Sequence, residues 1–414
     1  MRASVVGLGK IGLPLAVQFA GRGIDVVGLD VSRSVVDDVN RGIEPFPGES
    51  DLDTRLKRAV DAGRLRATSD AADAIVGSEV VVIVVPLVVD DRAQPDFTVI
   101  DAATETIAPH LSPGALVLYE TTLPLGTTRG RLLATLERIT GGRCGERFLL
   151  AFSPERVYSG RIFADLRRYP KLVGGVDAAS AAAAVEFYRA ALEFDDRADL
   201  PRPNGVWDLG SAEAAELAKL AETTYRDVNI AFANELTQVG ERLNIDVLAV
   251  IEACNSQPFS HIHRPGVAVG GHCIPVYPRL LLATADLRLP AVSREVNEAM
   301  PSEVVEWASG WLGGLDQRTV AILGVAYRGG VKEVAFSGAF ALQAELAARG
   351  ARPLAHDPLF SDEEIVALGF VPYRWGEGVD LAIVQADHAE YAKLGASVPE
   401  PFARVYDGRG VLEP

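Results

Sequence analysis

The segment 270–275, GGHCIP, places a cysteine between flexible glycines and a rigid proline. Most free cysteines are buried and behave as small apolar residues. Here the glycines would let the backbone approach a ligand closely, and His272 and Arg264 could favour the thiolate of Cys273, which is the nucleophilic form. On these residues alone, Cys273 is a candidate nucleophile or a core residue.

The other two cysteines show no spacing that would pair them or hold a metal. The chain has 3 cysteines in all and no CxxC motif, so neither a disulfide framework nor a zinc site is expected. Cys144 lies in a glycine-rich segment typical of a loop, and Cys254 lies in an apolar helical pattern that predicts a core position. We predict no metal site.

A second candidate site is the segment 7–12, GLGKIG. It follows a strand-like run and opens a helical pattern, which is the context that a dinucleotide-binding GxGxxG requires. The glycines permit a tight turn and let helix N-terminal amides approach a pyrophosphate. The residues predicted to contact the cofactor are Gly7, Gly9, Lys10, Ile11 and Gly12. The alternative is tight glycine packing without a ligand.

Asp30 indicates which dinucleotide would bind. It closes the second predicted strand, where a carboxylate can accept hydrogen bonds from the adenosine ribose hydroxyls. A carboxylate at this place would repel a 2′-phosphate, although the nearby Arg33 could meet one. The pattern therefore favours NAD over NADP.

The composition limits the class of protein. With 414 residues, 48% of them hydrophobic, the chain suggests two or three domains. Its formal net charge of −16 argues against nucleic acid as a partner, but a phosphorylated small molecule needs only a few local cations or helix N-termini. The apolar run 80–89 contains a proline and is about half of a membrane span. We expect a soluble, cytoplasmic protein without a signal peptide, because a strand-like run starts within the first residues.

Alternating strand-like and helix-like segments must position the N-terminal candidates. The predicted strands are 4–6, 25–29, 80–85, 115–119 and 148–152, and the predicted helices are 13–21, 34–40, 99–108 and 127–136. This βαβ alternation predicts a parallel, doubly wound sheet.

A long helix is predicted over 211–243, because its apolar residues recur mainly at three-, four- and seven-residue steps. These residues are Leu217, Ala221, Val228, Phe232, Leu236, Val239 and Leu243. At ~1.5 Å per residue the helix would be roughly 50 Å long, so it could bridge domains or pair subunits. After Thr319 a second alternation follows, with strands at 319–323, 353–356 and 381–385 and a helix at 339–349. The predicted fold class is α/β, with two Rossmann-like doubly wound domains joined by a central helical segment.

Several blocks of the sequence together are similar to those of one family. They are VGLGKIGLP (6–14), ETT (120–122), FSPER (152–156), AELAKL (215–220), RDVNIAFANE (226–235) and GGHCIP (270–275). Over nearly its whole length the chain resembles the nucleotide-sugar 6-dehydrogenases, the UDP-glucose, GDP-mannose and UDP-N-acetylmannosamine dehydrogenase family. The SPER and RDVNIAFANE blocks most resemble the branch that acts on UDP-N-acetylhexosamines.

The resemblance implies a domain organisation and partners. It implies an NAD-binding domain over 1–200, a central helical region over 201–305 that carries the cysteine, and a nucleotide-sugar-binding domain over 306–414. It also implies a homodimer through the helix 211–243. The implied substrate is a nucleotide sugar, with UDP favoured by the family branch.

The implied reaction oxidises C6 of the sugar in two steps. A first hydride transfer to NAD gives an aldehyde, which a cysteine thiolate traps as a thiohemiacetal. A second hydride transfer gives a thioester, and water hydrolyses this to the carboxylate. Such chemistry needs a nucleophile, an oxyanion stabiliser and a general base.

Matching positions assign these roles. Cys273 would be the nucleophile, Lys219 the cationic stabiliser and Glu155 the base candidate. Thr122 would lie near the reacting carbon, and Pro86 and Thr121 near the cofactor. Substrate contacts are expected from Asn234, Arg264, Gly266, Gly270, Gly271 and Tyr277. The alternatives are a solvated charge for Lys219, a turn cap for Glu155 and a buried structural amide for Asn234.

The chain departs from the family pattern at several of these places. Tyr277 replaces an aspartate usually found four residues after the cysteine, and Thr223 replaces an asparagine one helical turn after the lysine. Ala335 and Arg328 stand where an arginine and a lysine are usual, and Leu87 stands for a threonine. A tyrosine is neutral at pH 7, so a charge that would help to polarise the hydrolytic water is lost.

Three hypotheses remain. The first is a working NAD-dependent dehydrogenase whose pocket is reshaped by Tyr277. The second is an enzyme that binds NAD and the nucleotide sugar but stops at the aldehyde or catalyses an epimerisation without net oxidation. The third is a non-catalytic nucleotide-sugar-binding subunit. The joint presence of Cys273, Lys219 and Glu155 weighs against the third.

Overall fold

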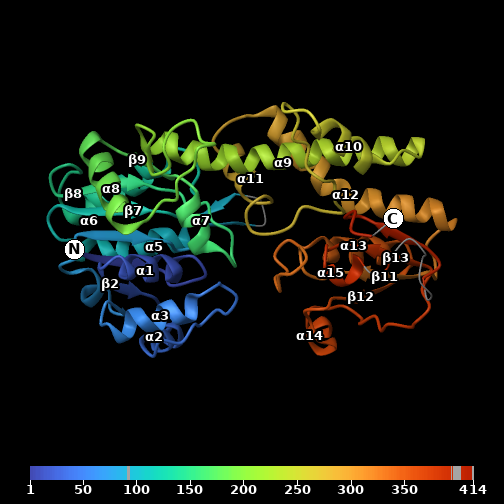
Figure 1. Ribbon diagram of the computed structural model, residues 1–414, viewed down its shortest axis with the longest axis horizontal. Coiled ribbons are helices and arrows are strands. Elements are labelled where there is room, and N and C mark those ends of the chain that lie inside the picture. Colours follow the sequence, from blue (N-terminus) through green and yellow to red (C-terminus); the bar gives the residue numbers. More distant parts are fainter. Residues whose placement is uncertain (91–93, 393, 395–401, 413–414) are drawn as a thin grey trace. The chain divides into compact units, whose positions relative to one another are not determined.

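The protein forms two compact units, Met1–Ala221 and Glu222–Pro414. The fold is taken from a computed structural model (Figure 1), which describes residues 1–90, 94–392, 394 and 402–412. The boundary between the units falls within one long helix, α9 (Ala212–Leu243).

The first unit is built on an 8-stranded sheet with the order β10-β9-β8-β7-β4-β1-β2-β3. Its strands are β1 (Arg2–Val6), β2 (Asp25–Leu29), β3 (Leu65–Thr68), β4 (Val80–Ile83), β7 (Ala115–Tyr119), β8 (Phe148–Phe152), β9 (Lys171–Gly175) and β10 (Val206–Asp208). A separate antiparallel pair is formed by β5 (Val88–Val89) and β6 (Pro95–Asp96). The run from β3 to β8 has the doubly wound order of a dinucleotide-binding fold, which confirms the predicted fold class.

The five predicted strands pair in parallel, but the sheet also contains β9, which was not predicted and which makes the sheet mixed. Strand β9 runs antiparallel to β8, with Ala151 opposite Gly175 and Phe152 opposite Gly174. A Cβ atom on Gly174 would lie 1.9 Å from the backbone oxygen of Ser211, so this strand passes too close to the start of α9 for any side chain. Periodicity does not report strand direction, which explains the difference.

Helices cover the sheet of the first unit, and their apolar faces complete its core. They are α1 (Gly12–Gly21), α2 (Arg33–Asn40), α3 (Leu52–Asp61), α4 (Ala71–Ile75), α5 (Thr98–Ile107), η1 (Ala108–His110), η2 (Thr128–Leu132), α6 (Leu133–Thr140), α7 (Ile162–Arg168) and α8 (Ala178–Ala191). Phe19 of α1 packs edge-on against Phe187 of α8, with ring centroids 5.2 Å apart. Both rings lie in the cluster that also holds Val5 and Val82 of the sheet.

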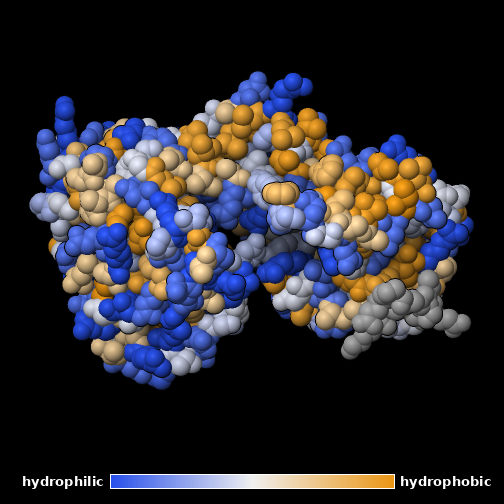
Figure 2. Space-filling model, turned by 45° about the horizontal axis from the view of Figure 1, so that its top comes forward, coloured by the Kyte–Doolittle hydropathy of each residue, from blue (hydrophilic) through white to orange (hydrophobic). Residues whose placement is uncertain are grey.

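Helix α9 confirms the predicted long helix, but much of its apolar face is exposed. Leu217, Phe232 and Leu243 are 44%, 49% and 64% exposed. Figure 2 shows hydrophobic surface over the part of the molecule that α9 and α10 (Val247–Asn255) form. An exposed apolar stripe of this kind marks a surface that another element can cover.

The prediction that Cys254 is a core residue is wrong. Cys254 is exposed, because α10 buries Ile251 but exposes its last turn. An apolar pattern in a short helix does not show which end of the helix leaves the core.

The second unit holds α11 (Tyr277–Leu282), α12 (Arg288–Leu312) and a 4-stranded parallel sheet with the order β12-β11-β13-β14. The sheet strands are β11 (Thr319–Leu323), β12 (Arg352–His356), β13 (Leu381–Val384) and β14 (Val405–Asp407), and the remaining helices are α13 (Gly338–Ala348), α14 (Asp362–Ala367) and α15 (Ala389–Ala392). Helices α12 and α13 pack on one side of this sheet, where Val304 and Leu342 meet Ile322 in one cluster. The predicted second alternation is confirmed.

Within the described ranges, no helix is long and apolar enough to cross a membrane. The same residues contain no cluster of His, Cys, Asp and Glu side chains that could hold a metal ion.

The turn after β11 yields a stability prediction. Gly324 has a φ of +106°, and a Cβ atom there would lie 2.3 Å from the Cβ of Ala386. Gly324→Ala should therefore lower the free energy of unfolding by about 2–4 kcal/mol through overpacking and backbone strain. Gly310→Ala is the matched control, because a Cβ atom there meets nothing within 4 Å and alanine favours the helix by ~1 kcal/mol. Urea unfolding of both variants tests the prediction. Equal unfolding midpoints for Gly324→Ala and Gly310→Ala would contradict it.

Candidate functional site

The strands β1, β4, β7 and β8 bring the N-terminal candidates to one edge of the sheet. Val6 pairs with Ile83, Ile83 with Tyr119, and Tyr119 with Phe152. Because these strands are parallel and in register, the segments that follow them leave the sheet at the same edge. The segments that emerge there are 7–12, 84–87, 120–122 and 153–156. Ligands of doubly wound sheets bind at this edge, where the strand order reverses between β1 and β4.

The segment 7–12 has the geometry of a dinucleotide-binding loop. Gly7 has a φ of +91°, and a Cβ atom on Gly12 would lie 1.8 Å from the backbone oxygen of Gly7, so the turn requires both glycines. At Gly9 a Cβ atom would meet nothing within 4 Å, and Lys10 is exposed. Helix α1 begins at Gly12, so its N-terminal amides belong to this loop. A tight turn, an open side at Gly9 and a helix N-terminus are the features that a loop needs to bind NAD, and this loop has all three.

The carboxylate of Asp30 is fixed beside this loop. One oxygen accepts from the backbone N–H of Leu8 at 2.8 Å, and the other accepts from the N–H of Ser32 at 2.8 Å. Each carboxylate oxygen has a further lone pair, so Asp30 can still accept from ribose hydroxyls. Arg33 is exposed at the first position of α2.

The remaining N-terminal candidates follow β4 and β7. Pro86 is exposed, and the neighbouring Leu87 is buried. The Thr121 hydroxyl donates to the backbone oxygen of Val85 at 2.5 Å, which joins the two segments. Thr122 is buried.

Glu155, the base candidate, belongs to a buried ionic cluster at the same edge. The ammonium of Lys171 lies 2.8 Å from one oxygen of Glu155 and 2.6 Å from an oxygen of Glu120. The Tyr188 hydroxyl donates to the other oxygen of Glu120 at 2.6 Å. Sequence reasoning did not find Lys171 and Tyr188, and it noted Glu120 only as part of the ETT block. A lysine at the start of a strand and a tyrosine in an alanine-rich helix carry no local signal of a cluster.

The two carboxyl groups that share the Lys171 ammonium differ in pKa. Burial raises the pKa of Glu120, and the attraction of Lys171 only partly offsets this rise, so the pKa is about 7. Burial also acts to raise the pKa of Glu155, but Lys171 and the N–H of Arg156 outweigh it, and this pKa is lowered. Glu155 is therefore ionised at neutral pH, while Glu120 titrates there.

Lys219 lies on α9 and is buried. Its neighbour Glu216 ties this part of the helix to the loop after β7, since its carboxylate accepts from the N–H groups of Gly126 and Thr128 and from the Thr128 hydroxyl. Lys219 is thus held on a helix turn anchored to the sheet, and it is not a solvated surface charge.

In the second unit, the cysteine segment packs onto the loop after β11. A Cβ atom on Gly270 would lie 2.6 Å from the Cβ of Tyr327, and one on Gly271 would lie 3.0 Å from its ring. The N–H of Gly271 donates to the backbone oxygen of Ala335 at 2.8 Å. The close contact with Tyr327 therefore explains why both positions are glycine.

Cys273 is half-buried and lies four residues before the start of α11. Its backbone oxygen accepts from the N–H of Tyr277 at 2.8 Å, so the position that departs most from the family pattern begins the next helix. His272 lies 3.8 Å from Glu333, and Arg264 is exposed and donates to the backbone oxygen of Gly410 at 3.4 Å. Neither of these two contacts involves the thiol.

Asn234 is fully buried, and its amide is bonded at both ends inside the protein. It donates to Asn297 at 2.8 Å and accepts from the N–H of Gly266 at 2.9 Å. Asn297 in turn donates to Asp227 at 2.8 Å, and Arg294 forms an ion pair with Asp227 at 2.7 Å. This chain of contacts, which sequence reasoning did not find beyond Asn234, holds the Gly266 loop on α9 and α12.

A cavity of about 200 Å³ lies next to Gly266 within the second unit. It is lined by the end of α9, the start of α10 and the loop after β14, and its lining includes Glu241, Leu248, Tyr406 and Arg409. Arg409 donates to the backbone oxygens of Gln385 and Tyr327. Burial lowers the pKa of this arginine.

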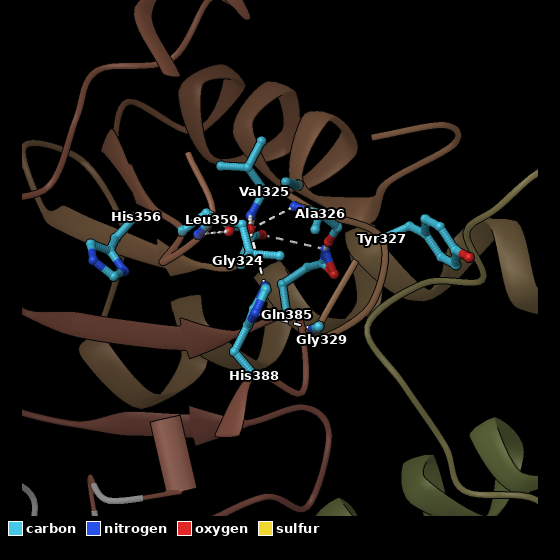
Figure 3. A network of polar contacts seen from close by, with 12 residues as sticks. Gly324, Val325, Ala326, Tyr327, Gly329, His356, Leu359, Gln385 and His388 are labelled. Atoms are coloured by element: carbon cyan, nitrogen blue, oxygen red, sulfur yellow. Dashed lines mark hydrogen bonds and ion pairs between the residues drawn. The ribbon is translucent and has the colours of Figure 1, made fainter. Parts of the chain in front are cut away.

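The loop after β11 is closed by an aspartate, as the loop after β1 is closed by Asp30. Figure 3 shows the network around this loop. One oxygen of Asp357 accepts from the N–H groups of Val325 and Ala326 at 2.8 Å and lies 3.2 Å from His388. The buried Gln385 amide donates to the backbone oxygen of Ala326 at 2.9 Å. These bonds fix the loop against which the cysteine segment packs.

Models of one protein family match regions in both units of the chain. Models of the UDP-glucose/GDP-mannose dehydrogenase family match three regions, namely the NAD binding domain at residues 1–192, the central domain at 213–299 and the UDP binding domain at 321–414. The UDP-N-acetyl-D-mannosamine dehydrogenase of Pyrococcus horikoshii is 35% identical over all of this chain and 96% of its own. The enzyme of that name from Escherichia coli K12 is 35% identical over 84% of this chain and 82% of its own.

A solved structure of the UDP-D-ManNAc dehydrogenase from Pyrococcus horikoshii superposes with a TM-score of 0.88 at 33% identity, covering 100% of this chain and 96% of that one. The family models span most of the sequence, and the glycine loop and Asp30 fit the cofactor that the first of them names. The chain therefore belongs to the UDP-glucose/GDP-mannose dehydrogenase family, and it is an NAD-dependent nucleotide-sugar dehydrogenase.

Proposed function

We propose that this enzyme oxidises C6 of a UDP-linked N-acetylhexosamine to the carboxylate through a thioester on Cys273. The observation that carries the proposal is the joint presence of Cys273, Lys219 and Glu155 in a chain that matches the family's NAD-binding, central and UDP-binding regions. The relatives named UDP-N-acetyl-D-mannosamine dehydrogenase support the class of sugar.

Each residue has a role in this proposal. The loop 7–12 and Asp30 would hold two NAD molecules in succession, and each of these would accept one hydride. The Cys273 thiolate attacks the aldehyde, and the Lys219 ammonium stabilises the oxyanion that forms. Glu155, whose pKa is lowered, is ionised and available as the base. Thr122 borders the reacting carbon, while Pro86 and Thr121 border the nicotinamide.

The substrate is proposed to contact the second unit around Gly266. Asn234 positions the backbone of this loop through its bond to the Gly266 N–H, and Arg264 is exposed beside it. Gly270, Gly271 and Tyr277 complete the substrate contacts. We assign the NAD-binding domain to 1–200, the central region to 201–305 and the nucleotide-sugar-binding domain to 306–414.

We also propose that α9 pairs with α9 of a second copy. Leu217, Tyr225, Phe232, Val239 and Leu243 are all at least 40% exposed. They recur at steps of eight, seven, seven and four residues, which places them on one stripe of the helix. A second copy of the same stripe would cover this surface.

A second candidate function is oxidation that stops at the aldehyde. It is favoured by Tyr277, which is half-buried at the start of α11 where the family has an aspartate, and by the fully buried Thr223 in place of an asparagine. Without the aspartate charge, hydration of the aldehyde would be slower.

The first prediction concerns stoichiometry and the thiol. Incubation with NAD and UDP-N-acetylmannosamine should release two NADH per sugar, followed by absorbance and by the mass of the product. Cys273→Ala should lower acid formation at least about 10³-fold, because the nucleophile is lost. Cys254→Ala is the control, since that thiol is exposed on α10, and it should retain full activity. Acid formation by Cys273→Ala at the wild-type rate would refute the assignment.

Tyr277→Asp separates the two candidate functions. If the wild type stops at the aldehyde, its product mass is lower than that of the sugar by two hydrogens, and Tyr277→Asp should add acid formation. If the wild type makes the acid, Tyr277→Asp should change the hydrolysis rate and leave the product unchanged. Release of no NADH from any UDP- or GDP-sugar on a panel would exclude both functions.

The dimer prediction is tested on exposed positions. Phe232→Glu should convert the protein to a monomer, because it places a charge in the centre of the apolar stripe. Phe259→Glu is the matched control, as Phe259 is 93% exposed and lies outside α9. Sedimentation velocity measures both, and a wild type that is monomeric at micromolar concentration would contradict the pairing.

A further inference from the structure

The buried cluster around Glu155 contains three residues that the proposed chemistry does not use. Glu120 follows β7, Lys171 opens β9 and Tyr188 lies on α8. The side chains of Lys171 and Glu120 are 4% and 0% exposed, and the ammonium lies 4.8 Å from the centre of the Tyr188 ring. Placing three ionisable groups out of water is costly unless they compensate one another.

One ammonium, that of Lys171, contacts both carboxyl groups of the cluster. If both were ionised, two buried carboxylates would share this ammonium with little water to screen their repulsion. Arg156 lies beside the cluster, but its guanidinium donates to the backbone oxygen of Pro170 at 2.5 Å, and its N–H donates to Glu155 at 2.7 Å. Asp165 and Tyr169 line the same small cavity as Glu155 and Lys171, and Asp165 accepts from Arg161 and from the N–H of Tyr158. The balance therefore depends on which carboxyl group holds a proton.

The two carboxyl groups differ in their surroundings. Tyr188 donates to Glu120, whose side chain is sealed, whereas the Glu155 side chain is 11% exposed. A cavity of about 10 Å³ lies beside Glu155 and Lys171, which is near the lower limit for one water molecule. Glu155 is thus the member of the cluster that can exchange a proton with a reactant, and Glu120 is the member that stays inside.

We propose that Lys171 is a positioning residue for Glu155: its ammonium fixes the Glu155 carboxylate and keeps it ionised, and Glu120, held by Tyr188, carries the proton that balances the cluster. This inference rests on the proposed function, in which Glu155 is the base. The raised pKa of Glu120, about 7, and the lowered pKa of Glu155 agree with this division.

The sign of the pH dependence follows from these roles. A base must be deprotonated, so the rate falls as the pH drops through the pKa of Glu155. Loss of the Lys171 charge removes the main factor that lowers this pKa, and the acidic limb of kcat should move up by about 1–2 pH units. Ionisation of Glu120 near pH 7 places two carboxylates on one ammonium, so the wild-type profile should show a further inflection there.

Kinetics of three variants test the proposal. Lys171→Met should lower kcat at pH 7 at least about tenfold and shift the acidic limb upward, with KM changed less than about threefold. Lys171→Arg keeps the charge and should restore the position of the limb. Glu120→Gln imitates the protonated form, so it should keep the acidic limb and lose the inflection near pH 7. Equal rate losses in Lys171→Met and Lys171→Arg with an unmoved limb would show a merely structural role and overturn the proposal.

A second readout does not depend on activity. Infrared difference spectra of the wild type between pH 6 and 8 should show a protonated carboxyl band that titrates near 7 and is missing in Glu120→Gln. If this band is absent from the wild type, the proposal fails. This measurement does not require that Lys171→Met folds. If the band is present but no nucleotide sugar yields NADH, the assignment of protons stands and the proposed function, with Glu155 as its base, fails.

Discussion

The in-register pairing of β1, β4, β7 and β8 is the constraint on which the first unit depends. Val6, Ile83, Tyr119 and Phe152 lie side by side across four strands. The segments that follow these strands, which carry the candidate site residues, therefore all leave the sheet at one edge. A shift of one residue in any pairing would turn its side chains to the opposite face. The residues that follow the shifted strand would then no longer lie level with those that follow its neighbours.

The same edge explains why the ionic cluster exists. Glu120 follows Tyr119 and Lys171 opens β9, which runs antiparallel to β8 with Phe152 opposite Gly174. The reversal of β9 brings the start of its strand to the edge where the parallel strands end. A lysine that would otherwise lie at the opposite edge thereby meets two carboxyl groups. The antiparallel pairing is thus what brings the members of the cluster together.

The second unit uses a similar device for a different purpose. Asp30 and Asp357 each follow the second strand of a parallel sheet and accept backbone N–H groups of the loop after the first strand. Asp30 is half-buried, whereas Asp357 is buried and lies next to His388. The first aspartate can serve a ribose, while the second rigidifies the loop on which the cysteine segment rests.

The sequence by itself determined the features that continuous segments encode: the glycine loop with Asp30, the long helix α9, most strands of both sheets and the cysteine motif. Only the tertiary structure decided that Lys171 meets Glu120 and Glu155, from positions 51 and 16 residues away, that β9 is antiparallel, and that Cys254 and the α9 stripe are exposed. The physical reason is that turn and helix geometry follow from local spacing, whereas the meeting of distant charges and the burial of a face depend on register and on what packs against them.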